Sequence, residues 1–459
     1  MTELIEKYAK TLPEYTELRA QTNTQKRVGL SDGRLIQNSS SEQSGVCSRV
    51  YRNGSYGFAA APSVNEESIA TVLKTARRNA EFLDRKQNLG KPCYPKIIPI
   101  RAYYDQEKTD PTTQKYMIDF LSEIDTHITE KYPALISREI ISPCLTTEKA
   151  LSTSDGVFSY SLVPHASLYI ILTAEDKDGV PQQLTANLGD YGYFSDVFKN
   201  PSDYFEETAR LYEQLMQKCE GVFADAGIKE CILHPDLAGI LAHEAVGHTT
   251  EADFVLSGSV AGKYLNKEVA SPLVTMVDFA STAFGKQCPV PIFIDDEGTL
   301  AKDVTIIENG ILKNYMHSKE SAVHFGTEPS GNARAFSFAD EPLIRMRNTV
   351  ILPGESKLDD MIASIDNGYY FVKTGNGQAD STGEFMFGIN FGYEIKNGKL
   401  GKAVKNTTIS GVAFEMLKTV TTLSDDMSWC STGMCGKKQP ISVGMGGPAI
   451  KCKVNVGGR

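Results

Sequence analysis

Two histidines flank a glutamate within residues 243–248, whose sequence is HEAVGH. Neutral imidazoles are good ligands for zinc, and an adjacent carboxylate can take a proton from water that a metal activates. The chain has only 7 histidines, so the grouping stands out from the composition. It predicts a hydrolytic metal site with His243 and His248 as ligands and Glu244 as the catalytic residue.

The spacing of these histidines requires a distorted helix. Residues four apart share one helical face, whereas residues five apart are turned by roughly 140°. Both imidazoles can therefore face one metal only if the helix widens to a π-type turn or ends between them. Gly247, just before His248, is the residue type that tolerates either distortion. A buried histidine pair on a core helix is the alternative.

A hydrolytic zinc site needs a third protein ligand and one open position. The residues alone leave that ligand open among His317, His324, Glu251, Asp253 and the C-terminal cysteines. Cys435 is flanked by glycines in residues 432–437 (TGMCGK), so its thiol could approach a metal with little hindrance. A bound metal would deprotonate it. A buried cysteine acting only as a small apolar residue is the alternative.

Composition narrows the class of protein. The 459 residues carry a net charge of −10 and 41% hydrophobic residues, which is ordinary for a globular protein. No apolar run is long enough to span a membrane, and residues 1–20 read as an amphipathic helix without the features of a secretory signal, so we expect a cytoplasmic protein. The 9 scattered cysteines fit reduced thiols. The acidic charge disfavours nucleic-acid binding.

The first half of the chain predicts an α+β arrangement. Alternating apolar and polar residues in 27–61 and 137–173 predict antiparallel strands. Helical spacing of apolar residues predicts helices over 63–84, 111–132 and 202–220. The polar, proline-containing residues 87–96 predict a connector.

The second half predicts a β-rich domain that carries the metal-site helix. A boundary within 221–229 divides the chain into an N-terminal α+β domain, residues 1–225, and a C-terminal domain, residues 226–459. The motif helix should span 237–250, and the chain looks β-rich from 265 onward. Asn-Gly pairs at 309–310 and 397–398, between alternating apolar runs, predict hairpins.

Several further stretches resemble one family, the TldD/PmbA metallopeptidases, once described as modulators of DNA gyrase. The segment HEAVGHTTEADFV resembles the family's H-E-x-x-x-H region. The match is dense from about Leu233 to the C-terminus and weaker before it. The other stretches that resemble family motifs are IDDEGT (294–299) with IIENGILKNYM (306–316), SGNAR (330–334), RMRNT (345–349) and GMCGKKQPISVGMGGPAIK (433–451).

The resemblance implies a zinc-dependent peptidase that hydrolyses small or unfolded peptides. It assigns the roles of zinc ligand to His243, His248 and Cys435, and the role of general base to Glu244. It also implies the catalytic TldD branch, working as a homodimer or as a heterodimer with a relative that lacks the motif. Thr249, Thr250 and Ala252 depart from the family pattern, which puts the shape of the adjacent loop in question.

The implied mechanism is hydrolysis by water that the zinc activates, with Glu244 moving the proton. We expect Arg334, His317 or a backbone amide to stabilise the oxyanion. A thiolate ligand should weaken the Lewis acid and give modest activity. Three rivals remain: a non-catalytic binding or regulatory subunit, a cysteine hydrolase with Cys435 as nucleophile, and a DNA-binding protein.

Other conspicuous residues have simpler interpretations. The carboxylates of residues 295–297 could form a metal cluster, but a solvated hairpin end is an equally good reading. Arg345 and Arg347 could bind a peptide carboxylate, although exposed strand arginines are more common. Glycines 444, 446 and 447 lack the strand-to-helix context of a phosphate loop, so nucleotide binding is not expected.

Overall fold

The N-terminal half is built on a long seven-stranded sheet in the computed structural model, which describes residues 1–459 except 10, 14, 92–98, 105–108 and 459. The order is β3-β2-β1-β5-β6-β4, with β7 beside β6. Every pairing is antiparallel except β4 with β6. The strands are β1 (Thr16–Ser31), β2 (Arg34–Arg52), β3 (Ser55–Ala61), β4 (Arg101–Tyr104), β5 (Ser137–Thr153), β6 (Phe158–Glu175) and β7 (Pro181–Tyr191).

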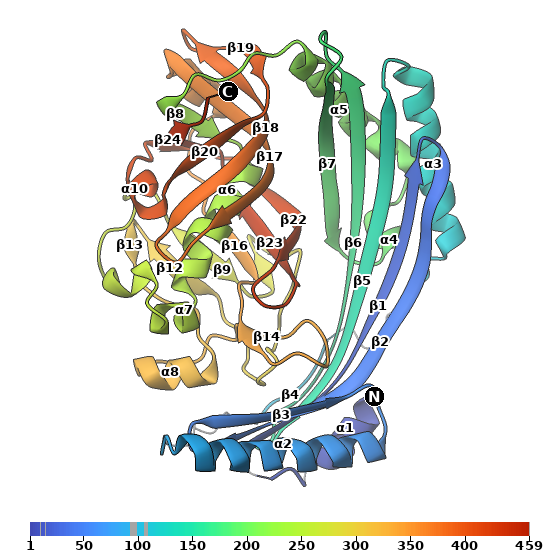
Figure 1. Ribbon diagram of the computed structural model, residues 1–459, viewed down its shortest axis with the longest axis vertical. Helices are drawn as coiled ribbons and strands as arrows, with labels where there is room; N and C mark the ends of the chain where they lie inside the picture. Colours follow the sequence, from blue (N-terminus) through green and yellow to red (C-terminus); the bar gives the residue numbers. More distant parts are fainter. Residues whose placement is uncertain (10, 14, 92–98, 105–108, 459) are drawn as a thin grey trace.

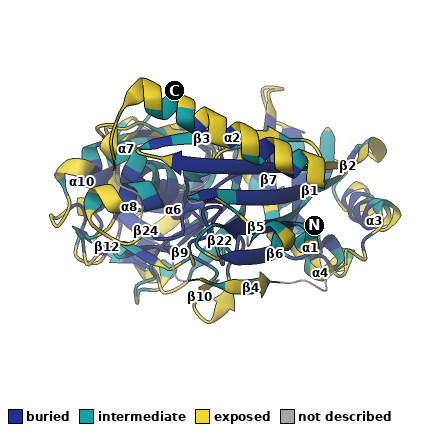
Figure 2. Ribbon diagram, turned by 90° about the horizontal axis from the view of Figure 1, so that it is seen from below, coloured by how far each residue is buried: buried dark blue, intermediate teal, exposed yellow. Residues whose placement is uncertain are grey.

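Helices cover one face of this sheet. Asn65 begins α2 by accepting a hydrogen bond from the Ser68 amide, and a stripe at helical spacing, including Ile69 and Val72, is buried. Figure 2 shows this helix with its exposed side outward, over dark blue strands. The helices are α1 (Thr2–Ala9), α2 (Glu66–Gln87), α3 (Gln114–Lys131), α4 (Phe194–Val197), a 3₁₀ turn (Pro201–Tyr204) and α5 (Phe205–Cys219).

The opposite face of the sheet contacts the C-terminal half. In β1, Leu18 and Ala20 join the core under the helices, while the alternate residues Arg19, Gln21 and Asn23 are buried but polar. These three side chains donate hydrogen bonds to backbone carbonyls of residues 336–340. The period of two along β1 therefore builds an apolar face for the helices and a polar face for the second half of the chain.

Two larger sheets form the C-terminal half. In one, β17, β8, β24, β20 and β18 pair in succession, and β18 pairs again with β17, so the strands close into a ring, with β19 and β21 attached. Its strands are β8 (Gly227–Leu233), β17 (Asn367–Ala379), β18 (Glu384–Lys396), β19 (Lys399–Val404), β20 (Thr407–Val412), β21 (Thr422–Leu423) and β24 (Ile450–Val456).

The other large sheet has the order β13-β12-β9-β16-β23-β22, and two small ribbons, β10-β11 and β14-β15, accompany it. Its strands are β9 (Met276–Phe279), β12 (Val304–Glu308), β13 (Ile311–Leu312), β16 (Asn348–Ile351), β22 (Ser428–Cys435) and β23 (Ile441–Gly447). The ribbons are β10 (Thr282–Ala283), β11 (Lys286–Gln287), β14 (Ala333–Arg334) and β15 (Leu343–Ile344).

The motif helix is packed between these two sheets. Leu237, Leu241 and Ala245 belong to one buried cluster with Phe371 and Phe387 from the ring-forming sheet, and this cluster extends to β9 and β12. Figure 1 shows α6 in the middle of the C-terminal half, with β17 and β18 on one side and β22 and β23 on the other. The helices here are α6 (Pro235–Leu241), a π-helix (Ala242–Gly247), 3₁₀ turns (His248–Thr250 and Val260–Lys263), α7 (Ala252–Leu256), α8 (Lys319–Phe325), α9 (Leu358–Ala363) and α10 (Ala413–Lys418).

The α+β class, the three N-terminal helices and both Asn-Gly hairpins are confirmed. One expectation was wrong: the N-terminal helix ends at Ala9, and β1 begins at Thr16, because residues 16–20 pair with β2 and β5. The connector at 87–96 lies partly outside the described residues. One apolar cluster joins α5 to β17 and β18 across residue 226, so the division into domains 1–225 and 226–459 stays a prediction.

Two groups of charged residues in the C-terminal half are buried, although solvent exposure was one prediction for them from the sequence. The carboxylates of Asp295, Asp296 and Glu297 are at most 6% exposed, so they do not form a solvated hairpin end. Cations on the polar face of the N-terminal sheet pair with Asp296 and Glu297. Asp295 instead accepts hydrogen bonds from the backbone amides of Glu297, Thr299 and Ala333. Arg345 and Arg347 are 0% exposed, which corrects their assignment as exposed strand arginines. Arg347 pairs with buried Asp278.

Among the described residues, no helix combines the length and the apolar character needed to cross a membrane.

Candidate metal centre

The helix that carries both motif histidines widens where the spacing predicted it would. Residues Ala242–Gly247 form a π-helix, and the His248 amide donates to the His243 carbonyl, five residues back. A 3₁₀ turn, His248–Thr250, follows at once. The wider turn takes up the extra residue of H-E-x-x-x-H, so both imidazoles reach the same side of the helix. The π-type turn predicted from the spacing is confirmed.

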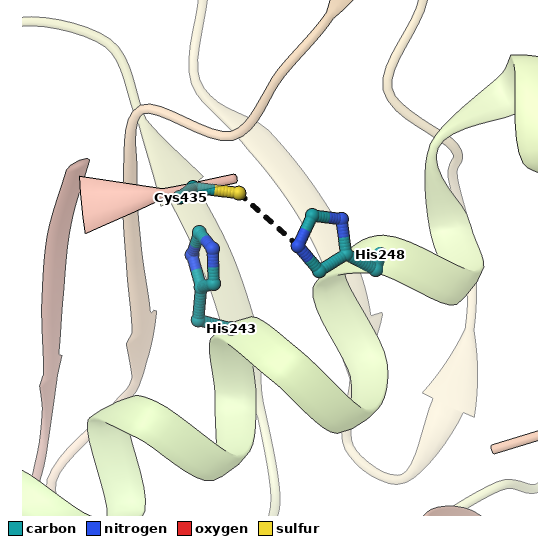
Figure 3. A group of neighbouring side chains, drawn as sticks. All are labelled: His243, His248 and Cys435. Carbon is teal, nitrogen blue, oxygen red and sulfur yellow. Dashed lines mark hydrogen bonds between the residues drawn. The ribbon is translucent and has the colours of Figure 1, made fainter. Parts of the chain in front are cut away.

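Cys435 closes the group from a distant part of the chain. It is the last residue of β22, paired with Ile441 of β23. One ligand atom each from His243, His248 and Cys435 lies within 4.8 Å of the others. The Cys435 Sγ is 3.2 Å from the His248 Nε2, and Figure 3 shows both rings turned toward the sulfur. The fold therefore brings together the three residues that the sequence singled out.

The burial of His243 fits a role as a metal ligand. Its side chain is 0% exposed, and neither ring nitrogen has a hydrogen-bond partner of acceptable geometry. Such a group is costly to bury, because each unpaired nitrogen loses its water. Metal–sulfur and metal–nitrogen bonds of about 2.3 and 2.0 Å set tetrahedral ligand atoms about 3.5 Å apart. The donor set, and the 3.2 Å between Cys435 Sγ and His248 Nε2, fit a bound metal ion.

His248 is oriented by a carboxylate on its far side. Its Nδ1 is 2.9 Å from Glu251 Oε2, and Glu251 is 0% exposed. A carboxylate accepts hydrogen bonds, so the proton belongs on Nδ1 and Nε2 is left to face Cys435. Glu244 lies beside the group, with Oε2 3.8 Å from His248 Nε2. Its side chain is 26% exposed, so solvent and substrate can reach it.

The electrostatics favour a thiolate. Burial would raise the pKa of the Cys435 thiol, but the neighbouring His243 and His248 outweigh burial and lower the pKa to about 3. Burial would lower the pKa of His248, but contacts with Cys435 and Glu251 raise it to about 10, so the imidazole and the thiolate form an ion pair, and a metal ion that bound there would displace the Nε2 proton. Because the thiolate is the form of cysteine that binds metals, the site holds Cys435 ready for a cation.

The other candidate ligands lie elsewhere or act differently. Glu251 contacts His248, and Asp253 accepts from Lys437, so neither joins the group of ligand atoms. His317 is buried against Ser321, and burial lowers its pKa to about 4. His324 lies on α8, against a neighbouring ring. Within the described residues, the His243, His248 and Cys435 group is the one set with metal-ligand geometry.

Arg334, a candidate for the oxyanion donor, is bound within the core. Its two terminal nitrogens donate to the carbonyls of Met346 and Ser442. Burial lowers its pKa to about 9. The terminal nitrogens of the Arg334 guanidinium are therefore already bonded to backbone carbonyls of the core.

The supporting roles of Arg345 and Lys437 were not predicted from the sequence. Arg345 donates to the carbonyls of Cys435, Lys437 and Gln439, and so surrounds the turn after the cysteine. Lys437 reaches Glu251. The only signal was indirect, because both residues lie inside the motifs 345–349 and 433–451, while their partners are distant in sequence.

Comparison with known proteins identifies the relatives. The family profile described as "PmbA/TldA metallopeptidase C-terminal domain" matches residues 227–458, and "PmbA/TldA metallopeptidase domain 1" matches residues 16–80. A protein named "Zinc metalloprotease TldD homolog" from Saccharolobus solfataricus is 32% identical over 90% of each chain. A "Metalloprotease TldD homolog" from Haemophilus influenzae is 30% identical over 97% of this chain and 93% of its own.

Solved structures share the fold along its whole length. TldE from Thermococcus kodakarensis superposes with a TM-score of 0.75 at 16% identity, covering 99% of this chain and 98% of its own. A putative modulator of a DNA gyrase from Thermotoga maritima gives 0.77 at 18% identity, with the same coverage. The resemblance to TldD/PmbA proteins seen in the motifs is thus confirmed: the chain belongs to the PmbA/TldA family of metallopeptidases.

Proposed function

We propose that this protein is a zinc-dependent peptidase that hydrolyses small or unfolded peptides, with His243, His248 and Cys435 as metal ligands and Glu244 as general base. The observation that carries the proposal is the convergence of these ligands around a buried His243 whose nitrogens have no partner. The zinc is supported by the two-nitrogen, one-sulfur donor set and by the name of the Saccharolobus solfataricus relative.

The residues of the chain divide the work of hydrolysis. When bound, the metal supplies Lewis acidity that polarises a carbonyl and acidifies water. Glu244 accepts the proton of the attacking water on a carboxylate oxygen and delivers it to the nitrogen of the leaving amine. Glu251 holds His248 in one orientation, and the buried surroundings of His243 keep solvent from that side of the site. The thiolate of Cys435 moderates the Lewis acidity, so we expect modest activity.

A cysteine hydrolase remains a second candidate, on one observation. Cys435 Sγ, His248 Nε2 and Glu251 follow one another at 3.2 and 2.9 Å, which is the order of a nucleophile, a base and an orienting carboxylate. Two features favour the metal instead. Cys435 is only 3% exposed, and the second imidazole of His243 has no role in a cysteine mechanism.

A peptidase assay separates these candidates. The substrate is a short unstructured peptide carrying a fluorophore and a quencher, and the protein is loaded with zinc. Glu244→Gln should lower kcat by about 10²–10⁴-fold while the metal stays bound. A chelator should abolish activity, and zinc should restore it. Activity that survives the chelator but is lost on alkylation would favour the cysteine hydrolase; no cleavage with zinc bound would favour a non-catalytic subunit.

The remaining parts of the proposal concern surroundings and partners. We place the protein in the cytoplasm, as a homodimer or as a heterodimer with a relative that lacks the motif. The scattered cysteines support a reducing compartment, and the net charge of −10 argues for peptide rather than nucleic-acid substrates. Sedimentation of the purified chain, alone and mixed with such a relative, tests the assembly.

A further inference from the structure

An ion pair joins the two parts of the candidate metal centre. Lys437 Nζ donates to Glu251 Oε2 at 3.1 Å. Lys437 stands two residues after Cys435, and Glu251 stands three residues after His248. The pair therefore connects the neighbour of one ligand to the neighbour of another, although β22 and the motif helix lie far apart in the sequence.

Glu251 is placed to orient a ligand and is costly to bury alone. Its Oε2 accepts hydrogen bonds from both His248 Nδ1 and Lys437 Nζ, while its Oε1 is buried without a hydrogen-bond partner. The Glu251 backbone is itself fixed by a bridge to Met316. A buried carboxylate with a free oxygen needs a compensating cation, and Lys437 supplies one.

The ammonium group of Lys437 is surrounded by hydrogen-bond acceptors. Its ammonium group donates to Glu251, to both oxygens of Asp253 and to the Ile344 carbonyl, and it lies 4.3 Å from the centre of the Phe254 ring. The side chain is 8% exposed. An ammonium group held by this many partners restrains its own backbone, and that backbone continues directly from Cys435.

We infer that Lys437 and Glu251 act as one positioning couple, which holds the Cys435 thiolate and the His248 imidazole at the separation that the metal requires. The inference rests on the proposed function, because it assigns a role toward the same metal. Neither residue touches the metal or the substrate in this role. Glu251 fixes which nitrogen of His248 faces the site, and Lys437 fixes the turn that follows Cys435.

The alternative is that the pair only stabilises the fold. Another buried ion pair offers a matched control: Lys405 Nζ lies 2.6 Å from Asp176 Oδ2, with side chains 9% and 3% exposed. Lys405 follows β19, Asp176 follows β6, and the pair contacts none of the candidate ligands. Removing it should cost stability without a specific effect on metal affinity.

The test is the zinc affinity of the full chain, measured by competition with a chelator of known affinity. The variants are Glu251→Gln, Lys437→Met, the double variant and the control Lys405→Met. Each single substitution in the couple should weaken zinc binding by about 10–100-fold. The double variant should bind zinc at least as tightly as the single variant with the lower zinc affinity, because both charges are removed together. Lys405→Met should bind zinc like the wild type.

Cobalt substitution adds a readout that a merely structural role would not move. The thiolate-to-cobalt charge-transfer band should weaken in Lys437→Met, because the sulfur is no longer held, and should be unchanged in Lys405→Met. Unfolding midpoints of the metal-free proteins, compared with the control, show whether a variant has simply failed to fold. The double variant lacks the uncompensated charge and keeps the test informative if a single variant does not fold.

The outcomes separate this inference from the proposed function. Wild-type protein that binds no zinc would overturn both. Zinc binding by the wild type with unchanged affinity in Glu251→Gln and Lys437→Met would overturn only the couple. If the fold-losses in zinc affinity of the two single variants multiplied in the double variant, the two residues would be acting independently, and that result would also overturn the couple.

Discussion

Gly247 lies directly against Met346, and this contact leaves no room for a side chain in the π-helix. A Cβ at position 247 would lie 1.9 Å from the Met346 Sδ. The backbone there has a φ of −54°, which any residue adopts. Glycine therefore allows the Met346 side chain to lie against the motif helix, and its conformational freedom is not what the π-turn uses.

Gly247→Ala should displace the buried Met346 side chain from its place against the motif helix. We expect a loss of about 1–3 kcal/mol in the free energy of unfolding, because the core is already filled. Denaturant unfolding measures it. Gly401→Ala is the control, since the contacts of its added Cβ begin at an ordinary 3.4 Å. Equal stability of the two variants would show that the helix does not depend on this contact. In a Met346→Ala background, Gly247→Ala should cost less than it does in the wild type, because the added methyl group then has room.

Arg345 should matter to the metal through the turn after Cys435. Arg345→Lys cannot reproduce three hydrogen bonds to the carbonyls of Cys435, Lys437 and Gln439, so zinc should be lost to a chelator about tenfold faster than from the wild type. Stopped-flow measurement of zinc release checks this. Arg347→Lys is a matched control on the same segment, because that arginine pairs with Asp278 instead. Equal release from both variants would contradict a specific role for Arg345.

The ion pairs of Asp296 with the N-terminal sheet should contribute to the free energy of unfolding. It accepts from Lys149 and pairs with Arg19, and burial, which would raise its pKa, is outweighed by these cations, so the pKa is lowered. Asp296→Asn leaves both cations without compensation and should cost about 3–5 kcal/mol of unfolding free energy. Asp119→Asn removes an exposed pair on α3 and should cost at most about 0.5 kcal/mol. Similar losses from the two variants would contradict this account.

His165 should make stability depend on pH. Burial lowers its pKa from 6.5 to about 4 in the folded chain. Between these values the unfolded chain binds the extra proton, so stability is complete above pH 6.5 and falls as the pH drops toward 4. The wild type should lose up to about 1.4 kcal/mol per pH unit relative to His165→Gln in this window. Parallel curves of unfolding free energy against pH for the two proteins would contradict this.

The sequence predicted the parts of the site that are local. Two histidines five residues apart can face one metal only if the helix widens or ends between them, and the π-helix at Ala242–Gly247 is the first of these two possibilities. Cys435 was one of 9 cysteines and became a specific prediction only through the family motif, because nothing local to residue 435 says that β22 ends beside the motif helix.

The errors have a common physical cause. A solvated hairpin end was one open reading of residues 295–297, because the partners of Asp296 and Glu297 (Arg19, Arg49 and Lys149) lie on the N-terminal sheet, far away in the sequence. Buried charges are decided by pairing across the fold, which periodicity does not report. The same applies to residues 16–20, whose helical pattern was overridden by pairing with two neighbouring strands.

Elemental analysis of the purified protein tests the central claim most directly. The account predicts about one zinc per chain in the wild type and in Glu244→Gln, and loss of the metal in His248→Ala and Cys435→Ala. Glu244 is not assigned as a ligand, so its variant separates metal binding from catalysis. A wild type that holds no metal after zinc is supplied, or a Cys435→Ala variant that keeps its zinc, would contradict the two-histidine, one-cysteine site.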